Sequence, residues 1–268
     1  MDIRVLYIAE IVGKAGIQCV KQLLPAIRKE HSIDFVIGNI NGATNGTGIG
    51  KNHAGYLHKL GIDVLTGGDK IYYKKDLVDD FSEMHYVLRP ANFPHESPGR
   101  SWKTCTVNGR KITVVSILGY TGFMRIHADN PFVQLPFLLE RLKKDTESII
   151  IDFHATTTAE KKTFAFYADG LVSAVIGSHG RVQTADERIM PKGTAAITDA
   201  GRSGCINSVG GCSKDAAINE YLTGIPNWTR GEEPTKETMP ELQGVIFTLK
   251  DDGTAKDIAR LREPLFKD

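Results

Sequence analysis

Residues 148–158, with the sequence SIIIDFHATTT, constrain the fold more than any other stretch of this chain. Three isoleucines, an aspartate and a phenylalanine form a short apolar run with polar residues on both sides. Such a run is typical of a strand buried on both faces, as in a parallel sheet. His154 stands where the run stops, so we expect it at the carboxyl end of the strand, the edge at which open α/β sheets bind ligands.

A second run repeats this plan, because residues 172–177 read VSAVIG and are followed by Ser178 and His179. Two histidines at matching strand ends indicate a functional site. The rest of the chain alternates between strand-like and helix-like patterns. Further strands are expected at 3–9, 34–39, 63–66, 86–90 and 194–198, and helices from the turn at 13–16 to about 30 and at about 52–60, 131–144, 159–168 and 214–223.

Two hairpins interrupt the alternation. The dipeptide Asn108-Gly109 lies between strand-like runs at 102–107 and 111–118 and is a strong signal for a tight hairpin turn. Residues 244–261 read as a closing hairpin, and the polar, proline-containing residues 227–242 before it are expected to form an excursion or a flexible loop. Together these patterns predict one α/β domain over residues 1–268, in which the strands could form a sandwich of two sheets.

The composition excludes several classes of function. The chain of 268 residues has a formal net charge of +1, which provides no general attraction to nucleic acid or anionic lipid. No run approaches the roughly 20 apolar residues of a membrane span, and the N-terminus does not resemble a signal peptide. The four cysteines are scattered, so we expect reduced thiols and a cytoplasmic protein.

Five polar residues lie at, or within a few residues of, the carboxyl ends of separate predicted strands: Glu10, Asn41, Asp69, His154 and His179. If those strands belong to one sheet, the five side chains converge on one edge. Two histidines with a carboxylate suit zinc, iron or manganese. The alternative for each residue alone is a turn or capping role, which is the commoner use of a polar residue after a strand.

Several motifs in this chain resemble the calcineurin-like metallophosphoesterases, and among these the small bacterial YmdB-like phosphodiesterases, which act on cyclic nucleotides. The similar motifs are AEIVGK at 9–14, GGDK at 67–70, LRPAN at 88–92, PGR at 98–100, DFHA at 152–155, GSHGRVQTAD at 177–186 and ITD at 197–199. The resemblance covers almost the whole chain. It implies a four-layered α/β sandwich with a two-metal centre at the strand ends, where the ions hold the phosphate and activate water.

The chain departs from the family pattern at most of the site positions. Of the eight site positions, only His154 and His179 keep the family residue. At the other six, the family pattern has Asp at 10, Glu-Asn at 41–42 with the glutamate bridging both metals, Asn-His at 69–70 with the histidine as catalytic acid, and a second ligating histidine at 181. This chain has Glu10, Asn41, Gly42, Asp69, Lys70 and Arg181 there. It also has Ala9 where the pattern has a glycine before the aspartate.

These departures argue against a normal two-metal centre. Neutral Asn41 cannot supply the anionic bridge, and Arg181 can neither ligate a metal nor lose its proton. A guanidinium roughly 5 Å from a divalent ion costs about 6–7 kcal/mol at an effective dielectric of about 20. An ordinary ammonium is a poor acid at neutral pH, so Lys70 is a weak replacement for the catalytic histidine but a good phosphate anchor.

Two hypotheses follow from the resemblance and its departures. In the first, the chain is a non-catalytic relative in which Lys70 and Arg181 replace the lost metal charge, pairing with Glu10 or Asp69 or holding a phosphate-bearing small molecule. In the second, it is a residual phosphodiesterase with one divalent ion, iron, manganese or zinc, on Asp69, His154 and His179, with Glu10 and Asn41 as further candidate ligands. A homo-oligomer is compatible with both.

Overall fold

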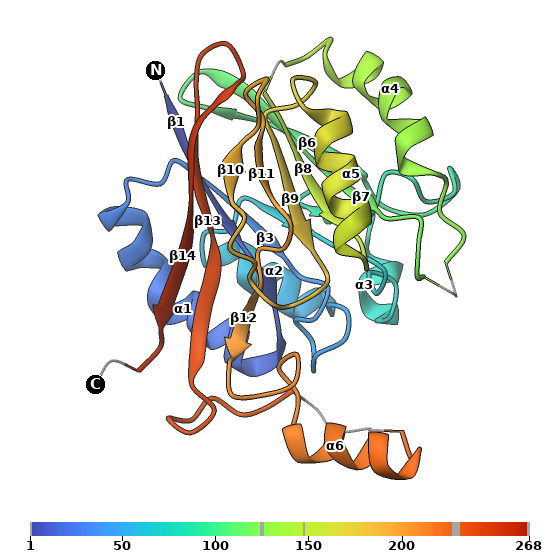
Figure 1. Ribbon diagram of the computed structural model, residues 1–268, viewed down its shortest axis with the longest axis vertical. Helices are drawn as coiled ribbons and strands as arrows, with labels where there is room; N and C mark the ends of the chain where they lie inside the picture. Colours follow the sequence, from blue (N-terminus) through green and yellow to red (C-terminus); the bar gives the residue numbers. More distant parts are fainter. Residues whose placement is uncertain (1, 124–125, 147, 227–230, 267–268) are drawn as a thin grey trace.

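The fold is a sandwich of two stacked sheets with helices on both outer faces (Figure 1). The structure is a computed structural model, and it is described here for residues 2–123, 126–146, 148–226 and 231–266. The first sheet has the order β2-β12-β13-β1-β3-β4-β5, with β14 paired to β13. Its strands are β1 (Ile3–Ile8), β2 (Glu10–Ile11), β3 (Phe35–Asn39), β4 (Val64–Thr66), β5 (Val87–Leu88), β12 (Arg202–Cys205), β13 (Pro240–Leu249) and β14 (Ala255–Pro264).

The second sheet has the order β10-β11-β9-β8-β7-β6. Its strands are β6 (Trp102–Val107), β7 (Arg110–Leu118), β8 (Ser148–His154), β9 (Ala174–Ser178), β10 (Arg188–Ile189) and β11 (Ala195–Ile197). The helices are α1 (Gly13–Glu30), α2 (Lys51–Lys59), α3 (Lys75–Asp79), α4 (Pro131–Leu142), α5 (Thr158–Ala168) and α6 (Lys214–Thr223).

Three apolar clusters hold the layers together. One joins α1, α2 and α3 to the first sheet, and another joins α4 and α5 to the second. The third fills the space between the sheets, with Tyr7, Phe247, Ile150 and Ile176 among its members. The order helices, sheet, sheet, helices is the four-layered α/β sandwich that the resemblance implied, so the predicted fold class is confirmed.

Strand β8 shows why the site lies between the sheets. All seven of its residues are buried, and successive side chains point to opposite faces. Ile149, Ile151 and Phe153 pack against the helices, whereas Ile150 faces the other sheet. Asp152 and His154 follow Ile150 on that inner face, so the space between the sheets becomes polar toward the carboxyl end of the strand.

Most of the expected elements are present, including the hairpin at Asn108-Gly109. Both of its turn residues have positive φ, 49° and 80°, as a type I′ turn requires. The four cysteines are free thiols. Within the described residues, no helix is long and apolar enough to cross a membrane.

Two expectations needed correction. The five site residues do not lie on one sheet, since Glu10, Asn41 and Asp69 belong to or follow strands of the first sheet, and His154 and His179 lie on the second. The expected excursion at 227–242 is too long, because β13 begins at Pro240, where it pairs with β12. Residues 227–230 lie outside the described residues.

Candidate metal and anion centre

Two facing sets of parallel strands bring the candidate residues together. Strands β1, β3 and β4 run parallel in the first sheet, and β7, β8 and β9 in the second. His154 is the last residue of β8, and His179 directly follows β9, whose Ser178 is in register with His154. The centre has two halves, an Asp–His–His cluster and an ion pair.

The cluster consists of Asp69, His154 and His179, whose ligand atoms all lie within 4.8 Å of one another. His154 Nε2 lies 3.1 Å from Asp69 Oδ1 and 3.1 Å from His179 Nδ1. One carboxylate oxygen and two imidazole nitrogens are a donor set for zinc, iron or manganese. The donor set therefore fits one divalent ion.

A buried hydrogen-bond chain orients His154. Its Nδ1 lies 2.8 Å from Ser178 Oγ, and Ser178 donates its only hydroxyl proton to Asp152 at 2.6 Å. Ser178 must then accept from His154, so Nδ1 carries a proton. Nε2 then faces Asp69 and His179, and it has either a free lone pair that can bind a metal or, in an imidazolium, an N–H. A hydrogen-bond partner on the other ring nitrogen, as Ser178 is here, fixes the orientation of metal-binding histidines.

Asp152 anchors this chain at the centre of the sandwich. Its carboxylate also accepts hydrogen bonds from Asn39 at 2.8 Å and Thr66 at 2.5 Å, both on the opposite sheet. The inner polar layer thus ties the two sheets together directly beneath His154.

Burial and neighbouring charges set the protonation of the cluster. Burial, together with the positive charge at His154, lowers the pKa of His179 to about 4, so its imidazole is neutral at pH 7. Burial alone would raise the pKa of Asp69, but the hydrogen bond and charge of His154 and the charge of Lys70 hold it well below its ordinary value. A neutral imidazole and an ionised carboxylate are the forms that bind metals.

Asn41 presents its amide nitrogen, not its oxygen, to the cluster. Its Oδ1 accepts hydrogen bonds from the backbone N–H groups of Gly68 and Lys70, at 3.0 and 2.9 Å. Its Nδ2 is thereby directed at Asp69 Oδ1, 2.8 Å away, and His154 Nε2, 3.2 Å away. An NH2 group cannot coordinate a cation, so this orientation does not fit the ligand role expected for Asn41.

The second half of the centre is an ion pair between Glu10 and Arg181. Two guanidinium nitrogens lie 2.9 and 2.6 Å from Glu10 Oε1, and the same group donates to the carbonyl oxygens of Gly210 and Gly46. Glu10 is 1% exposed, and its Oε2 has no hydrogen-bond partner among the described residues. Burial alone would raise the pKa of Glu10, but Arg181 keeps it below its ordinary value.

The ion pair does not fit a second metal ion. Arg181 holds the carboxylate that such an ion would need, and its own charge would repel a cation. The residues therefore fit one metal ion but not the two-metal centre of the family pattern.

Lys70 lies beside the cluster with its ammonium group in no ion pair among the described residues. A pocket of about 240 Å³ opens at the cluster itself, with Asp69 and His179 in its lining. Phe123 packs against both histidines, with ring centroids 6.2 Å from His154 and 5.2 Å from His179. The pocket is lined by Asp69, Tyr73, Gly122, Phe123, Ile126, Thr156 and His179.

Sequence reasoning missed several of the supporting residues, namely Asn39, Thr66, Asp152, Ser178 and Phe123. Asp152 carried a usable signal, because a carboxylate inside an apolar strand must find buried partners. Phe123 carried none, since a single aromatic residue in a loop has no periodic pattern.

The sandwich, with an Asp–His–His cluster at the carboxyl ends of its strands, defines a protein of the calcineurin-like metallophosphoesterase class. Within this class the chain belongs to the YmdB-like family, whose family model, described as YmdB-like protein, matches residues 6–261. This confirms the family predicted from the motifs.

Known relatives agree over nearly the full length. The chain is 35% identical over 256 residues to the 2',3'-cyclic-nucleotide 2'-phosphodiesterase of Bacillus subtilis, covering 95% of this chain and 94% of that protein. The crystal structure of a hypothetical protein from Thermus thermophilus has a TM-score of 0.89 and 30% identity, and covers 98% of this chain and 99% of its own. That of a phosphatase from Mycoplasma pneumoniae has a TM-score of 0.91 and 28% identity, with 98% and 94% covered.

Proposed function

We propose that this YmdB-like protein binds a phosphate-bearing ligand at a centre that does not carry out two-metal hydrolysis. The observation that carries the proposal is the ion pair between Arg181 and Glu10. A guanidinium supplies positive charge at that place without coordinating a water molecule or changing its protonation state. The electrostatic part of the family centre is retained in this arrangement, and the part that activates a nucleophile is lost.

Lys70 is the proposed anchor for the ligand, and Arg181 contributes positive charge from its ion pair with Glu10. The ammonium group of Lys70 is unpaired within the described residues and stands where the family pattern has its acid. Lysine binds phosphate as a point charge, and Lys70 is half-buried with a charge close enough to lower the pKa of Asp69 and of Glu10. The name of the Bacillus subtilis relative supports a cyclic nucleotide as the first ligand to test.

The test combines metal analysis with a turnover assay. Protein purified without chelator is expected to contain substoichiometric iron, manganese and zinc, and to leave 2',3'-cyclic AMP and bis-p-nitrophenyl phosphate intact. Calorimetry should nevertheless detect binding of 2',3'-cyclic AMP, and Lys70→Met should weaken it about tenfold, the value of one charge-assisted contact. Turnover that depends on a stoichiometric metal would overturn the proposal.

A second candidate function is a residual phosphodiesterase with one metal ion. The observation that favours it is the compact cluster of Asp69, His154 and His179. His179 is neutral, and His154 is oriented by its hydrogen bond to Ser178. A divalent ion on these three residues would supply Lewis-acid chemistry to a phosphoryl oxygen. Asp69 in place of a neutral ligand adds negative charge that favours a single cation, and Lys70 would hold the phosphate or serve as a weak acid.

The variant His154→Ala tests this second candidate. It removes one of the three ligands, so one-metal hydrolysis of bis-p-nitrophenyl phosphate should disappear together with the bound metal. Hydrolysis that persists in His154→Ala belongs to a contaminant or to another site, and would exclude the one-metal enzyme.

A further inference from the structure

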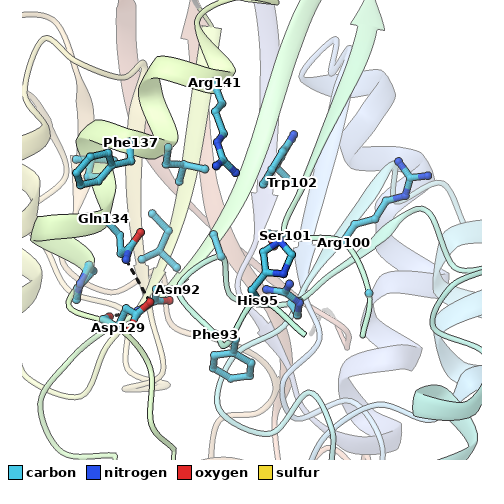
Figure 2. A pocket seen from close by; sticks show the side chains of 17 residues that line it. Asn92, Phe93, His95, Arg100, Ser101, Trp102, Asp129, Gln134, Phe137 and Arg141 are labelled. Atoms are coloured by element: carbon cyan, nitrogen blue, oxygen red, sulfur yellow. Dashed lines mark hydrogen bonds between the residues drawn. The ribbon is translucent and has the colours of Figure 1, made fainter. Parts of the chain in front are cut away.

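A second cavity lies away from the centre. It has a volume of about 500 Å³ and is lined by the loop that follows β5, the start of β6 and helix α4 (Figure 2). None of Glu10, Asn41, Asp69, His154 and His179 lines it. Its size is within the range of about 300–1,000 Å³ found for pockets that bind small molecules and cofactors.

The cavity has an excess of positive charge. Arg89, Arg100 and Arg141 line it, against the single carboxylate of Asp129. Asp129 accepts a hydrogen bond from Gln134 at 3.1 Å and pairs with none of the three arginines within the described residues. The cavity therefore carries a net charge that nothing described in the chain neutralises.

Arg89 is the most informative of the three because it is only 7% exposed. Its guanidinium donates to two backbone carbonyl oxygens, those of Ser97 at 3.2 Å and Pro90 at 2.9 Å, and to no carboxylate in the described part of the chain. Buried arginines are normally paired with an anion, since taking an unpaired charge out of water is expensive. Two backbone bonds leave further N–H donors for an anion in the cavity.

The cavity also offers an aromatic and aliphatic surface. Trp102 of β6 is half-buried and lines the cavity together with Leu135 and Leu138 of α4. Figure 2 shows Arg141 reaching down from α4 into the space beside Trp102, whereas the side chain of Arg100 points away from both. Positive charge and an indole face thus occur in the same cavity.

Asn92 holds the floor of the cavity in place. Its side-chain NH2 donates to the carbonyl oxygens of Leu118 and Asp129, both at 2.8 Å, and its Oδ1 accepts from the backbone of Leu118 at 2.9 Å. Arg89 and Arg100 are joined by a backbone hydrogen bond of 2.8 Å. The cavity is therefore preformed, which reduces the entropic cost of binding a ligand.

We propose that this cavity is a second ligand site, for a nucleoside monophosphate or a molecule of that chemistry. The phosphate lies at the guanidinium groups of Arg89 and Arg141, and the aromatic base lies against Trp102. Arginine suits phosphate because its planar fork gives two parallel hydrogen bonds, and stacking on an aromatic face tolerates any base. The site is independent of the centre around His154 and of the function proposed there.

Calorimetric titration of the full chain with AMP, inorganic phosphate and adenosine tests the proposal. AMP should bind more tightly than inorganic phosphate or adenosine, because only AMP contacts both the arginines and the indole of Trp102. Arg141→Ala should weaken AMP binding at least about tenfold, and Trp102→Leu should weaken AMP but not phosphate. Arg89→Gln keeps a donor for the backbone carbonyls while removing the charge, and should weaken AMP and phosphate alike.

Two controls make the result decisive. Arg4→Ala removes an exposed arginine on β1 and should leave AMP binding unchanged. Lys70→Met removes the proposed anchor at the centre; in that background AMP should still bind and Arg141→Ala should still weaken it, which separates this cavity from the centre. The proposal is overturned if AMP does not bind, if phosphate binds as tightly as AMP, or if Lys70→Met removes binding while Arg141→Ala does not. Should Arg89→Gln fail to fold, Arg141→Ala and Trp102→Leu carry the test.

Discussion

Gly42 lies so close to the ion pair of Glu10 and Arg181 that a side chain at this position would have to displace it. A Cβ atom at this position would lie 2.6 Å from Nη2 of Arg181 and 2.9 Å from Oε1 of Glu10. The family pattern has asparagine at this position. Glycine at 42 and arginine at 181 are therefore one coupled change, since the asparagine would displace the guanidinium.

The variant Gly42→Ala should lower the free energy of unfolding by about 2 kcal/mol, because the added methyl group forces Arg181 away from Glu10. Urea denaturation measures this loss. Gly55→Ala is the matched control: its Cβ would meet only the Tyr86 hydroxyl at 3.7 Å, within helix α2, where alanine is favoured. In an Arg181→Ala background the cost of Gly42→Ala should vanish, and an unchanged cost would refute the coupling.

Removing Arg181 alone should be more harmful than removing the pair. Arg181→Ala leaves the carboxylate of Glu10 buried without a partner and should cost about 3 kcal/mol of stability. Adding Glu10→Gln removes the buried charge and should recover part of that loss. Urea denaturation measures the free energy of unfolding of the single and double variants, with Arg4→Ala as the surface control. Equal stability of Arg181→Ala and Arg4→Ala would speak against a structural role of the pair.

Among the elements, β8 and α6 stand at opposite extremes. Every residue of β8 is buried, whereas α6 has no buried residue and extends from the body of the fold (Figure 1). Both ends of helix α6 are capped, since Ser213 accepts a hydrogen bond from the backbone N–H of Ala216 and Gly224 adopts a left-handed conformation. Its Ile218, Tyr221 and Leu222 are exposed.

Hydrogen exchange should therefore separate the two elements. Amide protons of α6 are expected to exchange with little protection, since opening the helix exposes no fully buried residue, while those of β8 should exchange only through global unfolding. Mass spectrometry of peptic peptides measures both. If α6 is as protected as β8, another copy of the chain covers it, and sedimentation velocity would then show the homo-oligomer that remains a prediction from the sequence.

The sequence predicted individual elements well because their signals are local. Consecutive isoleucines in β8, Asn108-Gly109 in the hairpin and Ser213 before α6 each act within a few residues. The pairing of strands is not local, so the pattern could not assign β1 and β8 to different sheets. Nor could it show that Asn41 turns its NH2 group inward, because the backbone donors of Gly68 and Lys70 that set this orientation come from another loop.

At the scale of the whole molecule, the chain has the framework of a metallophosphoesterase, and our proposal is that its centre differs from a two-metal centre. The sandwich, the strand ends and the chain from Asp152 through Ser178 to His154 do not depend on a second metal ion. Restoring the family residues should then restore the family chemistry. The restored variant carries Glu10→Asp, Asn41→Glu, Gly42→Asn, Asp69→Asn, Lys70→His and Arg181→His.

The restored variant should bind close to two equivalents of manganese and hydrolyse bis-p-nitrophenyl phosphate at least about 100-fold faster than the unchanged chain, since it regains a bridging carboxylate and a neutral-pH acid. Metal analysis and steady-state kinetics measure the two effects. Circular dichroism checks that the variant is folded, and His154→Ala within it should abolish the gain. A folded variant that binds no metal would show that the framework itself had diverged.

The pair of Glu10 and Arg181 has one more consequence. A metal ion in a protein is bound reversibly: it binds after synthesis, exchanges with competing ions and can be removed by a chelator. The charge of Arg181 is part of the polypeptide, so it is present from the moment the chain folds and in fixed stoichiometry. In the proposed centre, the positive charge at this position therefore does not vary with how much iron, manganese or zinc the surroundings provide.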